Sequence, residues 1–206
     1  MKTKGKLFGT ITFAFFFAMA AFAGNYEIDK NNSQVKWSGK KVTGEHYGTI
    51  GLKNGTVMVE DGKIAGGTFV MDMNTIVNED IKNESMNGRL VGHLKSDDFF
   101  LVEKYPDAKL VLKDVKHKSG DDYTFTGHLT IKEITHPVTF NAKSTVADGK
   151  LTSKGKIEVD RTLYDIKFRS GKFFSDLGDN LIYDTFTLDF DVVASPSSGE
   201  QMSGNQ

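Results

Sequence analysis

Alternation of apolar and polar residues is the sequence feature that most constrains the fold of this chain. Residues 186–192 place Phe, Leu, Phe and Val at every second position, with Thr and Asp between them. Residues 123–132, 138–146 and 151–160 repeat the pattern. Because successive side chains of a strand point to opposite faces, a period of two indicates strands with one buried and one wetted face. These four segments predict antiparallel strands.

Turn motifs separate the alternating segments. Asn54-Gly55, Asp61-Gly62 and Asp148-Gly149 tolerate the positive φ of a tight hairpin turn, and residues 120–122 predict another connection. Earlier strands are expected at residues 34–42, 49–52, 56–60, 63–73 and 108–116. A sheet of about eight antiparallel strands can close into a barrel, which removes its edges. The predicted fold is therefore an all-β, about eight-stranded antiparallel barrel in one domain.

Residues 83–105 interrupt this rhythm and predict one short helical segment. Apolar residues between Met86 and Leu94 fall at helical spacing. Ser96 is suited to cap the N-terminus of a second short turn, and Pro106 would end it.

The two ends of the chain are expected to lie outside the barrel. A basic start, an apolar run over residues 11–22 and the small-residue pattern Ala21-Phe22-Ala23 predict a signal peptide at residues 1–23. The apolar run is shorter than the ~20 residues that a membrane-spanning helix needs. We therefore expect a periplasmic or secreted protein whose domain covers residues 24–194. Residues 195–206 are rich in Ser, Gly and Gln and predict a disordered tail.

Composition argues against several classes of function. The net charge is −1, with acidic and basic residues mixed along the chain, which disfavours nucleic-acid binding and polybasic docking on membranes. The chain has no cysteine and so no thiol chemistry. It has no nucleophile elbow, no H-E-x-x-H helix, no P-loop and no dinucleotide motif. We expect no catalytic residues, no metal site and no cofactor. Lysines on the alternate face, such as Lys143 and Lys154, also argue against a membrane-spanning barrel and stable membrane insertion.

The interior is the expected functional surface. A barrel of about eight strands either fills its interior with side chains or holds one small ligand. Many phenylalanines, interrupted by small residues such as Gly127 and Ala142, favour a cavity. Bending of the strands at barrel corners explains the small residues equally well, so the residues alone leave both possibilities open.

Candidate site residues follow from strand parity and from their place in loops. Those expected to contact an apolar ligand are Trp37, Phe99, Phe100, Phe125, Leu129, Phe140, Ile157, Phe168, Phe186, Leu188 and Phe190. Those expected at the cavity mouth or near a ligand head group are His46, His93, Arg161 and Arg169. Salt bridges to nearby carboxylates are an alternative role for the two arginines.

Three blocks of sequence resemble the YceI-like family of periplasmic polyisoprenoid-binding proteins. They are residues 93–106 (HLKSDDFFLVEKYP), residues 127–138 (GHLTIKEITHPV) and residues 66–73 (GGTFVMDM). The resemblance covers about residues 26–194. It implies an extended, lipocalin-like barrel with a helical segment against one side, and a carrier that holds an isoprenoid or another long-chain amphiphile. Leu101 departs from the aspartate of many relatives, and residues 43–48 indicate a subgroup with its own ligand preference.

The sequence thus predicts an exported carrier or sequestering protein for a long apolar lipid, such as a polyisoprenoid or an isoprenoid quinone, bound without a covalent link. A protein that binds a fatty acid or a fatty amide is the alternative within the same class. An extracytoplasmic enzyme that uses His46 with a neighbouring carboxylate is an alternative from another class. A ligand-free, stress-related interaction protein is a further one, and a homodimer is possible.

Overall fold

The computed structural model describes residues 23–197. The expected signal peptide, apart from its last residue Ala23, and most of the expected tail lie outside the described residues. The described part forms a nine-stranded sheet, one α-helix and two 3₁₀ turns. In chain order the elements are β1 (Ala23–Ile28), β2 (Gln34–Lys41), β3 (Gly44–Glu60), β4 (Lys63–Asn78), α1 (Glu84–Lys95), β5 (Asp107–Ser119), β6 (Asp122–Ile131), β7 (Ile134–Ala147), β8 (Lys150–Asp160), η1 (Arg161–Tyr164), η2 (Gly178–Asn180) and β9 (Ile182–Pro196).

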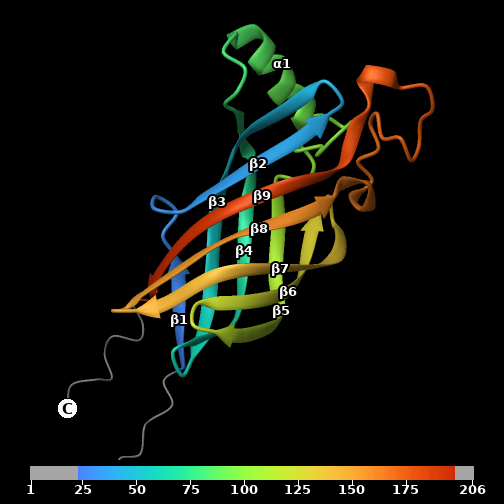
Figure 1. The fold of residues 1–206 in the computed structure, drawn as a ribbon. Coiled ribbons are helices and arrows are strands. Elements are labelled where there is room, and N and C mark those ends of the chain that lie inside the picture. The colour runs from blue at the N-terminus through green and yellow to red at the C-terminus, as the bar shows by residue number, and fades with distance from the viewer. Residues whose placement is uncertain (1–22, 198–206) are drawn as a thin grey trace, which may run out of the picture.

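The sheet closes into an eight-stranded antiparallel barrel, as the sequence predicts. Its strands follow the order β3-β2-β9-β8-β7-β6-β5-β4, and β4 pairs back with β3 (Figure 1). The remaining strand, β1, was not predicted. It pairs with residues 56–60 of β3 and residues 194–196 of β9, whereas β2 pairs with residues 44–50 and 182–191 of the same two strands. β1 and β2 therefore both lie between β3 and β9 and share one strand position in the barrel wall.

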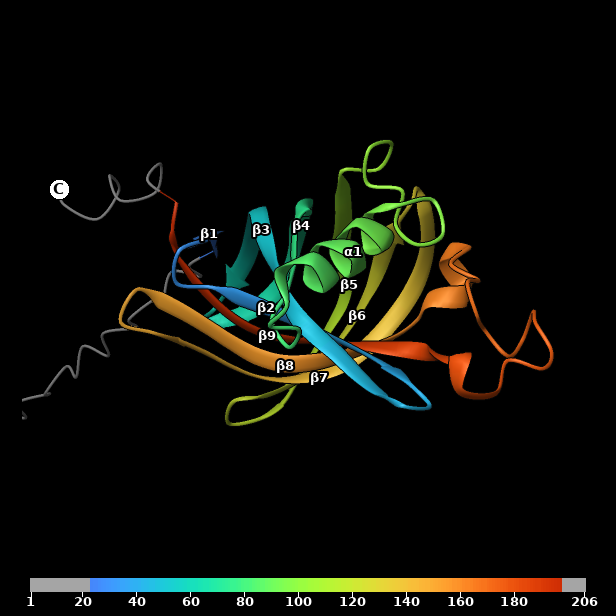
Figure 2. The same ribbon diagram turned by 90° about the horizontal axis from the view of Figure 1, so that it is seen from above.

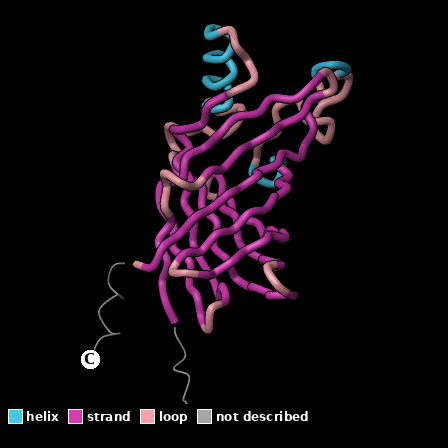
Figure 3. The backbone as a smooth tube through the Cα atoms, turned by 60° about the vertical axis from the view of Figure 1, so that its left-hand side comes forward, coloured by secondary structure: helices cyan, strands magenta, loops and turns pink. Residues whose placement is uncertain are grey.

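The barrel has two different ends. The upper end carries α1, the β2–β3 hairpin and the connection from η1 to η2, which Figures 1 and 2 show as separate projections. The lower end carries the turns that follow β3, β5 and β7 and both ends of the described chain (Figure 3). β9 extends to Pro196, so its last two residues lie within the segment predicted as tail.

The predicted turns are confirmed except for one. Asp61-Gly62 and Asp148-Gly149 have positive φ at both residues and join neighbouring strands. The turn predicted at Asn54-Gly55 is wrong, because both residues lie inside β3. The pairing register of β3 with β4 shifts between Leu52 and Asn54, so the Asn-Gly pair lies at an irregularity within a long strand. Bulges of this kind bend a strand, which a closed barrel requires.

The helical prediction is correct for its first half only. In α1 the side chain of Asn83 caps the N-terminus by accepting a hydrogen bond of 3.0 Å from the Met86 amide. Ser96 caps the C-terminus, where its hydroxyl donates to the His93 carbonyl at 2.8 Å. The second helical turn predicted from Ser96 onward is wrong: residues 97–105 form irregular turns, and Leu101 has a φ of 46°.

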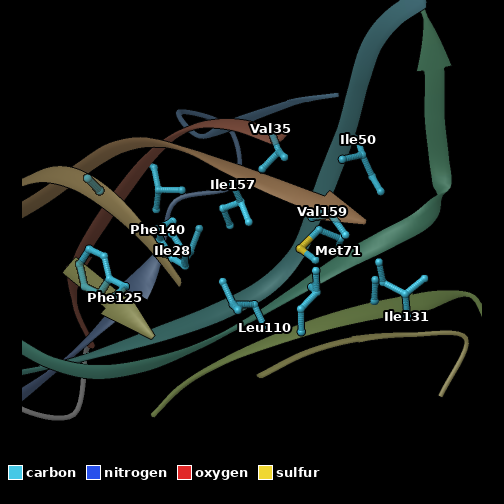
Figure 4. Packing of buried hydrophobic residues seen from close by; sticks show 14 of the residues in the cluster. Ile28, Val35, Ile50, Met71, Leu110, Phe125, Ile131, Phe140, Ile157 and Val159 are labelled. Carbon is cyan, nitrogen blue, oxygen red and sulfur yellow. The ribbon is translucent and has the colours of Figure 1, made fainter. Parts of the chain in front are cut away.

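Apolar side chains from all strands of the barrel point into its interior, and Figure 4 shows ten labelled residues of this core. Gly155 of β8 faces the same space. A Cβ atom at Gly155 would lie 2.7 Å from the Phe190 ring, so this small residue makes room for an aromatic neighbour. Small inner residues alone therefore do not show a cavity.

Candidate functional site: two apolar chambers

The barrel interior contains two chambers with apolar walls. The lower chamber has a volume of about 70 Å³ and the upper chamber about 110 Å³. Each is several times the ~10–15 Å³ that one water molecule needs. The side chains therefore leave space in the interior, which favours a cavity over a filled barrel.

The two chambers meet at a waist. Met71 of β4, Leu129 of β6 and Leu188 of β9 line both of them. Met71 and Leu129 are buried, whereas Leu188 is half-buried although it faces the interior. Since methionine is unbranched and adopts many rotamers, Met71 can move aside more easily than a branched residue. The waist can therefore separate the chambers or join them.

Nearly all of the apolar residues predicted to contact a ligand line these chambers. The lower chamber is lined by Phe125, Leu129, Phe140, Ile157, Leu188 and Phe190 among others. The upper chamber is lined by Trp37, Phe99, Phe100, Leu129, Phe186 and Leu188 among others. Phe168 is the exception: its ring packs 4.6 Å from the His93 ring and 5.7 Å from the Phe99 ring, centroid to centroid, and lines neither chamber.

Aromatic rings form much of the lower wall. The Phe125 and Phe140 ring centroids are 5.4 Å apart, and the Phe140 and Phe190 centroids are 5.7 Å apart. Tyr123 stacks on Phe125 at 5.6 Å. Such pairs hold their rings in preferred relative orientations. The lower chamber thus has a comparatively rigid apolar wall.

Two polar side chains in the chamber walls, Ser153 and Trp37, are bonded within the protein. Ser153 lines the lower chamber, and its hydroxyl lies 2.7 Å from that of Ser144. Trp37 lines the upper chamber, and its indole N–H donates to the Val77 carbonyl at 3.0 Å. Because these polar groups already have partners, the walls offer a ligand mainly apolar contact.

Arg161, the one predicted head-group residue in a chamber wall, is bonded to main chain. Its guanidinium donates to the carbonyls of Ile166 at 2.8 Å, Ile182 at 3.0 Å and Tyr183 at 3.1 Å. These bonds hold the first residues of β9, where the pairing of β9 with β2 is irregular. Asp184 lies 3.6 Å from Arg161 Nη2, which agrees with the expected salt bridge.

The charges around Arg161 are balanced. Lys172 Nζ lies 2.7 Å from Asp160 and 3.6 Å from Asp184, so two cations face two carboxylates. Burial lowers the pKa of Arg161, while Asp184 and Asp160 oppose that effect. For Asp160, burial opposes ionisation, but hydrogen bonds from Lys172 and Thr162 hold its pKa below the ordinary value. This end of the upper chamber therefore presents no excess positive charge.

His46 lies outside both chambers, beside a carboxylate. Its Nδ1 is 2.8 Å from Asp80 Oδ2, and the Tyr47 amide donates to Asp80 Oδ1 at 3.0 Å. Burial opposes ionisation of Asp80, but the hydrogen bonds from Tyr47, His46 and Asn78 hold its pKa below the ordinary value. A histidine oriented by a carboxylate is part of many catalytic triads. Within residues 23–197, however, no hydroxyl is hydrogen-bonded to His46.

His93 and Arg169, the other head-group candidates, lie around Phe168 rather than in a chamber. His93 Nε2 is 2.9 Å from Asp98 Oδ2, and its ring meets Phe99 and Phe168 edge-on. Arg169 is exposed, with its guanidinium 5.1 Å from the Phe168 ring centroid. These contacts join α1 to the connection between η1 and η2. They do not bring the four predicted head-group residues together.

The prediction missed the contribution of the early strands. Met71 is the most important omission because it forms part of the waist. The signal was present, since Phe69, Met71 and Met73 alternate with Thr68, Val70 and Asp72. Other chamber residues that were not predicted include Val35, Ile50, Leu52, Phe69, Met73, Leu110 and Leu112.

Two features are absent from the part of the chain that the structure describes. No three His, Asp or Glu side chains gather there in a group that could hold a metal ion. In the same part of the chain, no helix has the length and apolarity that crossing a membrane requires.

Comparisons with known proteins place this barrel in a family. Residues 26–194 match the YceI-like domain. A UPF0312 protein of Photorhabdus laumondii is 34% identical over 168 residues, which cover 78% of this chain and 82% of that protein. Two solved structures share the fold. BcnA of Burkholderia cenocepacia has a TM-score of 0.66 at 20% identity and covers 82% of this chain and 99% of its own. A polyisoprenoid-binding domain from Saccharophagus degradans has a TM-score of 0.57 at 14% identity and covers 83% and 98%. The chain belongs to the YceI-like domain family.

Proposed function

We propose that this protein is an exported, non-enzymatic carrier or sequestering protein for a long-chain apolar lipid, held in the two chambers. The observation that carries the proposal is the apolar interior, in which two chambers meet at a single waist. The polyisoprenoid-binding description of the Saccharophagus degradans domain agrees with it.

The chambers favour an apolar tail over water. An apolar cavity offers water no hydrogen-bond partners, so such cavities stay dry and bind apolar molecules. Moving a lipid tail from a bilayer into the barrel is a transfer between two apolar environments, so the gross hydrophobic gain nearly cancels. Selectivity then depends on the length and shape of the chambers and on the groups at their mouth.

The charges at the mouth bear on the type of lipid. A fatty acid would bring a carboxylate to a site where Arg161 and Lys172 are already balanced by Asp160 and Asp184. Its carboxylate would find no unpaired cation at that site. A lipid with an uncharged head group, such as an isoprenoid quinone or a polyisoprenoid alcohol, needs no cation. We therefore favour an isoprenoid over a fatty acid as the ligand.

The enzyme hypothesis has one observation in its favour, the His46–Asp80 pair at 2.8 Å. That pair lies outside both chambers. A lipid whose tail is bound in the barrel would therefore meet His46 only if its head group extended to the upper end of β3. The hypothesis of a ligand-free interaction protein has no such support, because it requires a filled barrel.

Native mass spectrometry and lipid extraction of the full chain, purified from its own host, test the proposal. The parent protein is expected to carry an isoprenoid lipid. Phe125→Asp places a carboxylate against the lower chamber and should expel the lipid, because the charge has no partner there. Thr124→Asp, on the outer face of the same strand, is the matched control and should retain it.

His46→Ala separates a carrier from an enzyme. A carrier should lose little of its bound lipid in this variant, since His46 lines neither chamber. An enzyme would keep its substrate but lose about 10²–10⁴ in rate. A parent protein that extracts with no lipid, or a lipid converted by the parent and left unchanged by His46→Ala, would overturn the proposal.

A further inference from the structure

Exposed apolar side chains are concentrated at the upper end of the barrel. Of the large apolar residues that are most exposed among residues 23–197, Met58 alone belongs to the lower end, on β3. The others lie on the upper ends of the strands, on α1, or on the connection from β8 to β9 (Figure 1). They are Val42, Tyr47, Val77, Met86, Leu163, Phe173, Phe174 and Tyr183.

Three cations lie beside the most prominent of these residues, and two of them are paired with carboxylates: Lys167 with Asp165 at 2.5 Å and Lys172 with Asp160 at 2.7 Å. Residues 167–174, with the sequence KFRSGKFF, contain three cations, three phenylalanines and no acidic residue, and we call them the basic–aromatic segment. Lys167 Nζ lies 5.3 Å from the Phe173 ring centroid, and the guanidinium of Arg169 lies 5.1 Å from that of Phe168. Arg169 forms no ion pair within residues 23–197, so it is the cation of this segment that remains available to an anionic partner.

The basic–aromatic segment is a folded turn. Ser170 is fully buried, and its carbonyl accepts hydrogen bonds from the amides of Phe173 at 3.1 Å and Phe174 at 3.0 Å. Lys172 anchors the same turn to Asp160 at 2.7 Å. The two phenylalanines are nevertheless 48% and 51% exposed, so the fold holds them in contact with solvent.

The exposed apolar surface reaches the upper chamber. Tyr183 is 50% exposed and also lines that chamber. Its carbonyl is fixed by Arg161, which lines the chamber too. A lipid that left a bilayer at this end of the barrel would therefore meet apolar surface between the rim and the interior.

We propose that the upper end of the barrel docks on the surface of a bilayer that contains anionic phospholipid. Phe173 and Phe174 enter the boundary between head groups and acyl chains, and the guanidinium of Arg169 lies among the phosphates. Aromatic residues favour this interface, and each Lys or Arg near an anionic surface adds to the binding. The proposal rests on the lipid-carrier function, because docking would let a lipid move between the bilayer and the barrel without crossing water.

This local arrangement differs from the polybasic docking that the sequence disfavours. The net acidity of the chain weakens long-range attraction to anionic membranes. Contacts within the Debye length, about 8 Å at physiological ionic strength, depend on the residues at the surface itself. The docking is expected to be peripheral, reversible and weaker at high salt.

The test is co-sedimentation of the full chain with vesicles made of equal parts phosphatidylglycerol and phosphatidylcholine. The double variant Phe173→Ser/Phe174→Ser should bind with a partition coefficient about tenfold lower, because the apolar contact is lost. Met58→Ser is the matched control, since Met58 is equally exposed at the lower end, and it should bind like the parent.

A second pair of variants tests the charge. Arg169→Gln should reduce binding to these vesicles about fivefold and leave binding to vesicles of pure phosphatidylcholine unchanged. Lys118→Gln, at the lower end of β5, removes the same charge far from the proposed surface and should have no effect. Melting temperatures should be equal for all four variant proteins and the parent.

Three results would overturn the docking proposal. The parent could fail to sediment with the mixed vesicles, or the double phenylalanine variant could bind them as well as the parent. Sedimentation velocity could instead show a parent dimer that this variant dissolves, which would assign the surface to a second copy of the chain. The lipid extracted from the purified protein is measured separately. A parent that docks but carries no lipid would contradict the carrier function and leave the docking intact.

Discussion

Arg161 Nη2 donates a hydrogen bond of 3.0 Å to the carbonyl oxygen of Ile182, which ties the end of β8 to the start of β9. Two further bonds from the same guanidinium reach the carbonyls of Ile166 and Tyr183. A single buried side chain thus satisfies three main-chain acceptors at the rim of the upper chamber. Its role follows from the backbone around it rather than from an anionic ligand.

Arg161→Leu should therefore destabilise the fold. It removes the donors of three carbonyls and leaves Asp184 with Lys172 as its remaining cation, so the free energy of unfolding should fall by about 3–5 kcal/mol. Urea denaturation followed by circular dichroism measures this loss. Arg169→Gln, an exposed position nearby, should change stability by less than about 0.5 kcal/mol. Similar urea midpoints for the two variants would contradict the structural role of Arg161.

Tyr164→Phe should be neutral or stabilising. The Tyr164 side chain is 1% exposed, and its hydroxyl has no hydrogen-bond partner within residues 23–197. Phenylalanine removes this unsatisfied group, so the variant should equal the parent or exceed it by about 1 kcal/mol at neutral pH. If urea denaturation shows a free energy of unfolding more than about 1 kcal/mol below that of the parent, the hydroxyl has a hydrogen-bond partner.

Tyr164 should also make stability fall in alkali. Burial raises its pKa from the ordinary 10.0 to about 12. A raised pKa in the folded state favours the protonated form, so its contribution is complete below pH 10 and is lost as the pH rises from 10 through 12. Tyr164→Phe should show a smaller loss in that window than the parent. Tyr183→Phe, which changes an exposed tyrosine, should follow the parent.

Neighbouring positions on β9 should respond in opposite ways. Phe190 lines the lower chamber, whereas Asp189 on the other face lies 3.3 Å from Lys156 in an exposed ion pair. Phe190→Asp places an unpaired carboxylate against apolar wall and should cost several kcal/mol, about 3 or more. Asp189→Asn should cost less than about 0.5 kcal/mol. Equal melting temperatures would show that the assignment of inner and outer faces is wrong.

The waist should control the length of the bound lipid. Leu188 lines both chambers, so Leu188→Phe should narrow their junction and Leu188→Ala should widen it. Mass spectrometry of the co-purified lipid should show shorter tails in the first variant and longer or more varied tails in the second. The two variants control for each other, because both alter the same wall. An identical lipid in both would show that the tail does not pass the waist.

Much of the fold can be predicted because inside and outside alternate locally along each strand. In β6 to β9 the pattern extends over seven to ten residues, so those strands and many of their chamber residues are found from parity. β1 has only six residues and begins at the last residue of the predicted signal peptide, so its alternation is too short to stand out. The Asn54-Gly55 error has a different cause. Turn propensity is local, whereas the continuity of β3 depends on its pairing with β4.

The site is harder to predict because it depends on how distant strands align. Met71, Leu129 and Leu188 form the waist only because the stagger of the strands brings them to one level of the barrel. No spacing along the chain reveals that. Arg161 gives a second example, since its partners are carbonyls exposed by the irregular start of β9. A charged residue in a loop indicated a head-group contact, whereas its surroundings give it a structural role.

The place that β1 and β2 share in the wall has a consequence for the order of assembly. Both strands can pair with β3 early, but their second neighbour is β9, where Tyr26 meets Pro196 and Gln34 meets Asp191. A chain made from its N-terminus must therefore keep one seam open until its last strand is complete, and closing so long a loop is slow. The chambers come into being only with that final strand. A lipid can be enclosed only by a finished chain, and an incomplete chain exposes the apolar wall that the closed barrel hides.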